Sequence, residues 1–150
     1  MSTIYLDDLE AGQVYELGSR SLSEDEIIAF ARDYDPQPFH VDPEAATTTI
    51  YGGVIASGWQ TAAIFNRLLV DGLLIRSAAM GSPGLEDFRW LKPVRPGDRL
   101  HARVEVLETR PSRSKPDRGI AKLRCIVADG SQGEVLTFIA NVLFQRRETG

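Results

Sequence analysis

The spacing of apolar residues changes along the chain, from a helical repeat in the first half to strict alternation in the second. An early segment carries apolar residues on one helical face: Ile27, Phe30, Ala31 and Tyr34. From Leu85 onward, apolar and polar residues alternate, which is typical of half-buried β-strands. We therefore expect a mainly helical first half and a second half built mainly from strands.

The early helix has recognisable start and stop signals. Ser23 is followed three positions later by Glu26, the spacing of a capping box, so the helix is expected to begin at Ser23. It is expected to end near Tyr34, because Pro36 disfavours helical backbone for the residue before it. A short strand over Val14 to Arg20 is expected to precede it.

A longer helix is predicted from about Ser57 to Ile75. Its apolar residues surround most of its circumference: Trp59, Ala62, Ala63, Phe65, Leu68, Leu69 and Leu73. Such a helix is expected to be buried on most sides. Asn66, Arg67 and Asp71 interrupt the apolar run well short of the roughly 20 residues needed to cross a bilayer. We therefore expect a core helix and no membrane partner.

Three long strands follow, each with an apolar residue at every second position. Their apolar residues are Leu100, Ala102, Val104 and Val106, then Ala121, Leu123, Cys125 and Val127, and finally Leu136, Phe138, Ala140, Val142 and Phe144. The separators at 95–98, 110–119 and 129–133 are rich in turn residues, and each is short enough to join neighbouring strands. Together with the strand from Leu85, this pattern predicts a four-stranded antiparallel meander.

One apolar helix and a curved antiparallel sheet cover each other's apolar surfaces best when the sheet wraps the helix. The prediction is an α+β fold of the hot-dog type. With 150 residues, 43% of them hydrophobic, the chain has the size of one domain, over residues 1–150, and can bury a core without disulfides or a structural metal.

Composition excludes several classes of function. A formal net charge of −4 provides no basic face for nucleic acid. The single cysteine, Cys125, permits no intramolecular disulfide, and the N-terminal segment lacks the pattern of a secretion signal, so a cytoplasmic protein is expected. With two histidines and no cysteine cluster, no metal site is expected.

Candidate chemistry lies in "FARDYDPQPFHVDPEAA", residues 30–46, which surrounds one histidine with carboxylates and prolines. On a helix, Asp35 and His40 would point about 140° apart, but a stiff loop broken by prolines lets them converge. A carboxylate and an imidazole that share a small volume can hold a water and exchange protons with a substrate, which suits hydration or dehydration. In the alternative interpretation, Asp35 caps a turn and His40 is a buried, satisfied histidine. Asp42 and Pro43 are interpreted as a helix start.

A second motif, "YGGVIASGWQTAA", opens the long helix. Ser57 is a candidate N-cap, and the first-turn N–H groups that follow lack intrahelical partners. With the helix dipole, they can stabilise negative charge on an acyl oxygen brought against Gly58, where the missing side chain permits close approach. A Ser-Gly helix start is also common where it has only a structural role. The motif indicates a functional site because it occurs together with Asp35 and His40.

Together, "DYDPQPFHVDPEAA" and "YGGVIASGWQTAA" resemble the MaoC-like dehydratases, close to the (R)-specific enoyl-CoA hydratases, over roughly Val14 to Phe144. The resemblance implies one hot-dog domain with Asp35 and His40 as the catalytic pair, Gly58 as the donor to the thioester carbonyl and Ser57 as its supporting neighbour.

The resemblance also implies an activity and an assembly. The expected reaction is reversible addition of water to 2-enoyl-CoA, giving 3-hydroxyacyl-CoA. Coenzyme A takes part as a portion of the substrate, and no separate cofactor is expected. Subunits are expected to pair into a homodimer or a multiple of one, which covers the free sheet edge and apolar flank of a lone domain.

The first motif departs from the usual hydratase pattern at three positions. Gln37 stands where an asparagine is typical, Phe39 replaces an aliphatic residue, and Tyr34 replaces a glycine. These changes retain the acid-base pair but alter the loop beside it. They therefore bear on the choice of substrate more than on the chemistry.

Two other functions stay open. A non-catalytic acyl-thioester-binding subunit would keep the fold without turnover. A hot-dog thioesterase would need a carboxylate near the start of the central helix, whereas the first acid there is Asp71. The basic loop around Arg113 can meet coenzyme A phosphates or form a solvated hairpin tip. His101 and Cys125 are assigned no catalysis, and Phe88 and Trp90 are interpreted as core or interface residues.

Overall fold

The structure is a computed structural model, and it describes residues 2–131 and 133–148. Its helices are η1 (Leu6–Asp8), α1 (Glu24–Tyr34), α2 (Pro38–Val41), α3 (Pro43–Ala46), α4 (Gly58–Gly72) and η2 (Leu74–Arg76). Its strands are β1 (Val14–Ser21), β2 (Gly84–Trp90), β3 (Arg99–Pro111), β4 (Arg118–Ala128) and β5 (Glu134–Gln145). Gln132, in the turn predicted at 129–133, lies outside the described residues.

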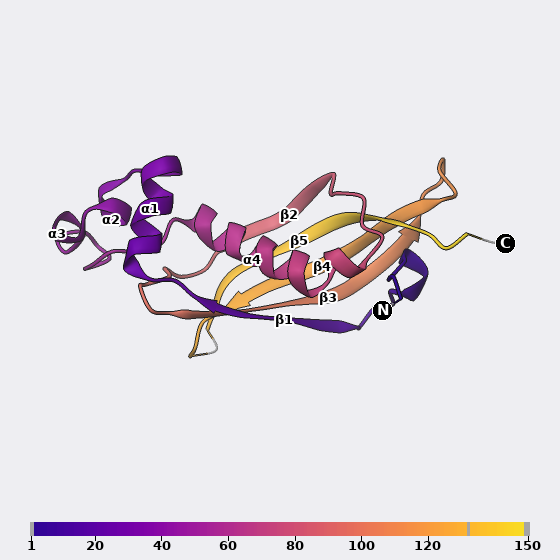
Figure 1. Ribbon diagram of the computed structural model, residues 1–150, viewed down its shortest axis with the longest axis horizontal. Helices are drawn as coiled ribbons and strands as arrows, with labels where there is room; N and C mark the ends of the chain where they lie inside the picture. Colours follow the sequence, from indigo (N-terminus) through magenta and orange to yellow (C-terminus); the bar gives the residue numbers. More distant parts are fainter. Residues whose placement is uncertain (1, 132, 149–150) are drawn as a thin grey trace.

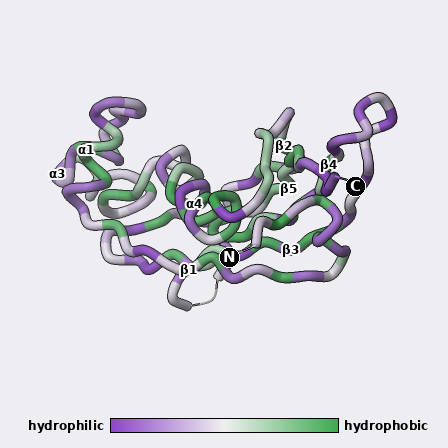
Figure 2. The backbone as a smooth tube through the Cα atoms, turned by 45° about the vertical axis from the view of Figure 1, so that its right-hand side comes forward, coloured by the Kyte–Doolittle hydropathy of each residue, from purple (hydrophilic) through white to green (hydrophobic). Residues whose placement is uncertain are grey.

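The core lies between α4 and one face of a single antiparallel sheet with the order β1-β3-β4-β5-β2 (Figure 1). The alternating apolar residues predicted on the three long strands are all buried. Phe65 of α4, for example, packs edge-on against Phe138 of β5, with ring centroids 5.1 Å apart. Hydropathy colouring shows hydrophobic segments both in α4 and in the strands that it covers (Figure 2). The predicted α+β hot-dog fold is confirmed.

Helix α1 begins and ends where its local signals predict. The Ser23 hydroxyl accepts a hydrogen bond from Glu26 N at 3.1 Å, and Glu26 Oε1 accepts one from Ser23 N at 3.2 Å, which completes the capping box. The helix ends at Tyr34, with Asp35 as its C-cap. These predictions are confirmed because each depends on residues within one turn of the helix end.

The central helix departs from its prediction in length and burial. Helix α4 ends at Gly72, and a separate 3-10 turn, η2, follows it. The helix is also not buried on most sides in the single chain, because the sheet covers only one of its faces. Trp59 is 59% exposed and Ala63 is also exposed.

The predicted four-stranded meander is wrong for β2. Strands β3, β4 and β5 do follow one another as antiparallel neighbours, but β2 pairs with β5 and β3 pairs with β1. The turn-rich segment at 91–98 therefore connects two strands that are not adjacent. Alternation of apolar and polar residues shows which face of a strand is buried, but it does not specify which strand lies beside it.

Helices α1, α2 and α3 gather at one end of the sheet, beside the start of α4, while both termini lie toward the other end (Figure 1). This grouping brings the two sequence motifs together. Among the described residues, no helix is long and apolar enough to cross a bilayer.

Candidate active site

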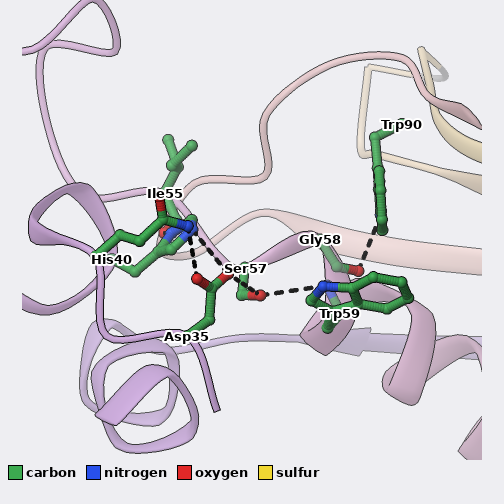
Figure 3. Close-up of polar contacts among 8 residues, drawn as sticks. Asp35, His40, Ile55, Ser57, Gly58, Trp59 and Trp90 are labelled. Carbon is green, nitrogen blue, oxygen red and sulfur yellow. Dashed lines mark hydrogen bonds and ion pairs between the residues drawn. The ribbon is translucent and has the colours of Figure 1, made fainter.

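Asp35 and His40 converge as predicted. Nε2 of His40 lies 3.3 Å from Oδ2 of Asp35, and both side chains are largely shielded from solvent (Figure 3). Asp35 is the C-cap of α1, but His40 does not lie on a loop: it belongs to α2, a one-turn helix that begins at Pro38. The loop prediction for His40 is wrong because proline favours the first position of a helix, where no N–H is needed.

The His40 ring is held in one orientation. Its Nδ1 lies 2.7 Å from the carbonyl oxygen of Ile55, and Phe39 packs edge-on against it with ring centroids 4.5 Å apart. A carbonyl oxygen can only accept a hydrogen bond, so Nδ1 carries a proton and donates it. Nε2, which faces Asp35, is therefore the nitrogen that can gain and lose a proton.

Both carboxylate oxygens of Asp35 accept hydrogen bonds. Oδ1 accepts from Nε2 of Gln37 at 2.6 Å, and Oδ2 accepts from the Ser57 hydroxyl at 2.7 Å. Burial raises the pKa of Asp35, but the hydrogen bonds from Ser57 and Gln37 and the charge of His40 together lower it below 3.8. Asp35 is thus a carboxylate at neutral pH, the form that can accept a proton.

Ser57 links Asp35 to the start of the central helix. Its hydroxyl accepts a hydrogen bond from Trp59 N at 3.3 Å, which confirms the predicted N-cap of α4. The same hydroxyl donates to Asp35 (Figure 3). Asp42 is likewise confirmed as an N-cap, of α3, with Pro43 at the first helical position.

Gly58 lies at the start of α4 against the indole of Trp90. Nε1 of Trp90 donates to the Gly58 carbonyl oxygen at 2.9 Å. A Cβ added to Gly58 would lie 2.5 Å from Trp90 Cε2. The expectation that the missing side chain gives room to a substrate is therefore wrong for this conformation, because Trp90 fills that space. The role of the Gly58 N–H as a donor stays a prediction.

A cavity of about 400 Å³ adjoins these residues. Its lining includes Asp35, His40, Gly58, Tyr51, Trp59, Thr61, Trp90 and Lys92. This volume falls in the usual range of small-molecule sites, which combine a mainly apolar wall with a few polar groups. Sequence reasoning gave no role to Tyr51, Thr61 or Lys92. Tyr51 and Thr61 lie within the second motif, but nothing in their spacing showed that they face the cavity, and Lys92 lies outside both motifs.

Of the side chains that were given no role in the site, His101 and Cys125 lie away from this cavity, whereas Trp90, interpreted as a core or interface residue, lines it. His101 is exposed on β3 and Cys125 is buried in the core. The basic hairpin between β3 and β4 lies at the end of the sheet opposite α1, α2 and α3 (Figure 1). Within one chain, its cations therefore do not border the Asp35–His40 site. Across residues 2–131 and 133–148, no group of three or more His, Cys, Asp or Glu side chains is arranged to bind a metal.

Comparison with known proteins gives a consistent result. The family model described as "MaoC like domain" matches residues 8–127. The chain is 35% identical over 133 residues to the uncharacterized protein YdeM of Bacillus subtilis, covering 89% of this chain and 92% of that protein. It is 32% identical over 133 residues to a 3-hydroxybutyryl-CoA dehydratase of Methylorubrum extorquens, covering 88% of this chain and 79% of that protein.

Solved structures show the same relationship. The crystal structure of a MaoC-like dehydratase from Rhodospirillum rubrum superposes with a TM-score of 0.89 at 39% identity. The match covers 97% of this chain and 99% of the other. Fold and sequence similarity thus extend together over nearly the whole chain.

Proposed function

Because the chain belongs to the MaoC-like dehydratase family, we propose that it is a hydratase/dehydratase that reversibly adds water to 2-enoyl-CoA and yields 3-hydroxyacyl-CoA. The observation that carries this proposal is the Asp35–His40 pair, 3.3 Å apart at the wall of a 400 Å³ cavity. The 3-hydroxybutyryl-CoA dehydratase named among the relatives supports the reaction class.

In the proposed mechanism, a water molecule on the cavity side contacts both Oδ2 of Asp35 and Nε2 of His40, which lie 3.3 Å apart. The water oxygen bonds to C3 of the enoyl group while one of its protons passes to the Asp35–His40 pair. The π electrons of the double bond move toward C2 and the thioester oxygen, and C2 then takes a proton from the pair. The pair ends with the protons it began with. Hydration changes no overall oxidation state, so we propose no cofactor besides the coenzyme A of the substrate.

The start of α4 is proposed to stabilise the negative charge that develops on the thioester oxygen. The N–H of Gly58 lies in the first turn, at the positive end of the helix dipole. For a thioester to reach it, the carbonyl must enter the cavity between His40 and Trp90. Ser57 is hydrogen-bonded both to Asp35 and to the first turn of α4. It therefore fixes the position of the proton-transfer groups relative to the oxyanion donor.

The experiment that tests this function follows the absorbance of the conjugated thioester with a panel of enoyl-CoA substrates. Wild type is expected to hydrate at least one of them, and Asp35→Asn is expected to lose about 10²-fold or more in kcat. If wild type binds enoyl-CoA but turns over none, the protein is a binding subunit. Helix α4 offers a thioesterase no carboxylate of its own near its start, because its first acid, Asp71, is ion-paired with Arg67 near the far end, away from the cavity.

We further propose that the chain forms a homodimer or a multiple of one through β2 and the exposed side of α4. Strand β2 pairs with β5 on one side only, and it is an edge of the sheet. Large apolar side chains are exposed around it: Trp59, Leu85, Trp90 and Leu91. An apolar edge of this kind favours association. Light scattering that shows a stable monomer at micromolar concentration would contradict this assembly.

A further inference from the structure

Two of the cavities formed by the described residues border α4, and of these two only the first is lined by Asp35 and His40. The second, of about 350 Å³, lies between α4 and strands β2 and β5. Its wall is mainly apolar and includes Phe65, Leu69, Leu85, Phe88 and Phe138. Its chemistry fits a hydrocarbon chain and offers few partners to polar groups.

Three aromatic side chains, Trp59, Phe88 and Trp90, stand between the cavities, and we name them the aromatic partition. Trp59 and Trp90 line the first cavity, whereas Phe88 lines the second. Their ring centroids lie 5.0 Å apart for Trp59 and Trp90, 4.8 Å for Phe88 and Trp90, and 6.2 Å for Trp59 and Phe88. One packed cluster therefore presents faces to both cavities.

Trp90 is held in place by more than packing. Its Nε1 donates to the Gly58 carbonyl oxygen at 2.9 Å, and its ring occupies the space that a side chain at Gly58 would need (Figure 3). This contact brings the partition against the start of α4, where the thioester is proposed to bind. An acyl chain that extends from the thioester toward the second cavity meets Trp90 on the way.

An irregularity in β2 orients the partition. The pairing of β2 with β5 shifts register between Glu86 and Arg89, and Asp87 has φ of 51°. In a regular strand, Leu85 and Phe88 would point to opposite faces, since they are three residues apart. The bulge turns both toward the second cavity, which places Phe88 behind Trp90.

We propose that the aromatic partition ends the acyl-binding space of the wild-type protein at the first cavity, and that Trp90 is the specificity-determining residue that limits it to short acyl chains. This inference rests on the proposed hydratase function. The second cavity accepts the distal carbons of a longer chain only when Trp90 is removed. Trp90 contacts the acyl portion of the substrate and takes no part in proton transfer.

The test compares kcat/KM for 2-enoyl-CoA substrates of four and eight carbons in wild type, Trp90→Ala and Trp90→Leu. Wild type is expected to favour four carbons by about tenfold or more, and both variants are expected to raise the eight-to-four ratio by about tenfold, the lower end of the effect of one methylene group in a pocket. Ile75→Ala removes an exposed apolar side chain that lines neither cavity, and should leave the ratio unchanged.

The outcomes separate the two proposals. If wild type hydrates the four-carbon substrate but folded Trp90 variants keep its eight-to-four ratio, the partition proposal is overturned and the hydratase proposal stands. A wild-type preference for eight carbons also overturns the partition. If wild type hydrates neither substrate nor any other enoyl-CoA, the hydratase proposal itself fails. Trp90→Leu retains a large apolar side chain, so a folded variant is available even if Trp90→Ala does not fold.

Discussion

The hydroxyl of Ser57 donates a 2.7 Å hydrogen bond to Asp35, although the two residues are 22 positions apart. The same oxygen accepts a hydrogen bond from Trp59 N and caps α4. One buried side chain therefore ties the end of α1 to the start of the central helix. Any shift of either helix end moves the candidate base relative to the candidate oxyanion donor.

Ser57→Ala is expected to lower the free energy of unfolding by about 1 kcal/mol through loss of the cap. It also removes a hydrogen bond that lowers the pKa of Asp35, so this pKa should rise. The acidic limb of the kcat/KM profile should then move to higher pH. Ser23→Ala is the matched control, because Ser23 caps α1 without touching Asp35 and should cost stability without moving the profile. If the pH profile of kcat/KM for Ser57→Ala matches that of wild type, Ser57 does not influence the candidate site.

Asp35→Asn and His40→Gln nearly preserve shape and abolish proton exchange at neutral pH. Each is expected to lower kcat by about 10²-fold or more. The double variant should be little worse than either single one, since groups that hold one water act as a unit. Binding of product, measured by calorimetry, should stay within roughly tenfold of wild type. Full hydration rates in both single variants would show that the segment only terminates a helix.

Gly58→Ala is expected to displace Trp90, because the new methyl would lie 2.5 Å from its ring. Overpacking of this kind costs about 1–3 kcal/mol, to be measured by urea unfolding together with a changed tryptophan emission. Gly53→Ala is the matched control, since the nearest atom to its Cβ would be Arg95 Nη1 at 3.8 Å. Adding Trp90→Ala to Gly58→Ala should relieve the penalty. If Gly58→Ala is as stable as wild type, the close packing of Trp90 on Gly58 is disproved.

Asp129 is expected to make the free energy of unfolding depend on pH in the acidic range. Its pKa is held well below 3.8 by Lys92, by the Ser131 hydroxyl and by the backbone N–H groups of Ser131 and Gly133, against the opposing effect of burial. A carboxyl whose folded pKa is depressed stabilises the fold above its unfolded pKa, and this contribution is lost as pH falls through the folded value. Wild type should therefore lose more than about 1 kcal/mol relative to Asp129→Asn between about pH 5 and pH 2. Parallel stability curves for the two proteins would contradict this assignment.

Cys125 is expected to be inert in the folded protein. Burial raises the pKa of its thiol to about 12, so almost no thiolate forms at neutral pH. A chromogenic disulfide reagent should label one thiol per chain only after denaturation. Rapid labelling under native conditions would mean that β4 opens readily or that Cys125 is accessible.

Local signals in the sequence determined much of the architecture. Three features could be predicted because each depends on neighbours within a few residues: the capping box at Ser23, the helix end near Tyr34, and the alternation from Leu100 to Phe144. The convergence of Asp35 and His40 was also expected from the sequence, since prolines restrict the five-residue path between them.

Contacts between distant segments were decided only by the tertiary structure. Three such contacts have no local signature in the sequence: the pairing of β2 with β5, the packing of Trp90 on Gly58 across 32 positions, and the position of Lys92 in the cavity wall. They arise because the sheet must curve over α4 and its free edge then approaches the start of that helix. An alternating pattern specifies which side of a strand is buried, whereas the identity of its neighbours follows from how the whole chain fills the core.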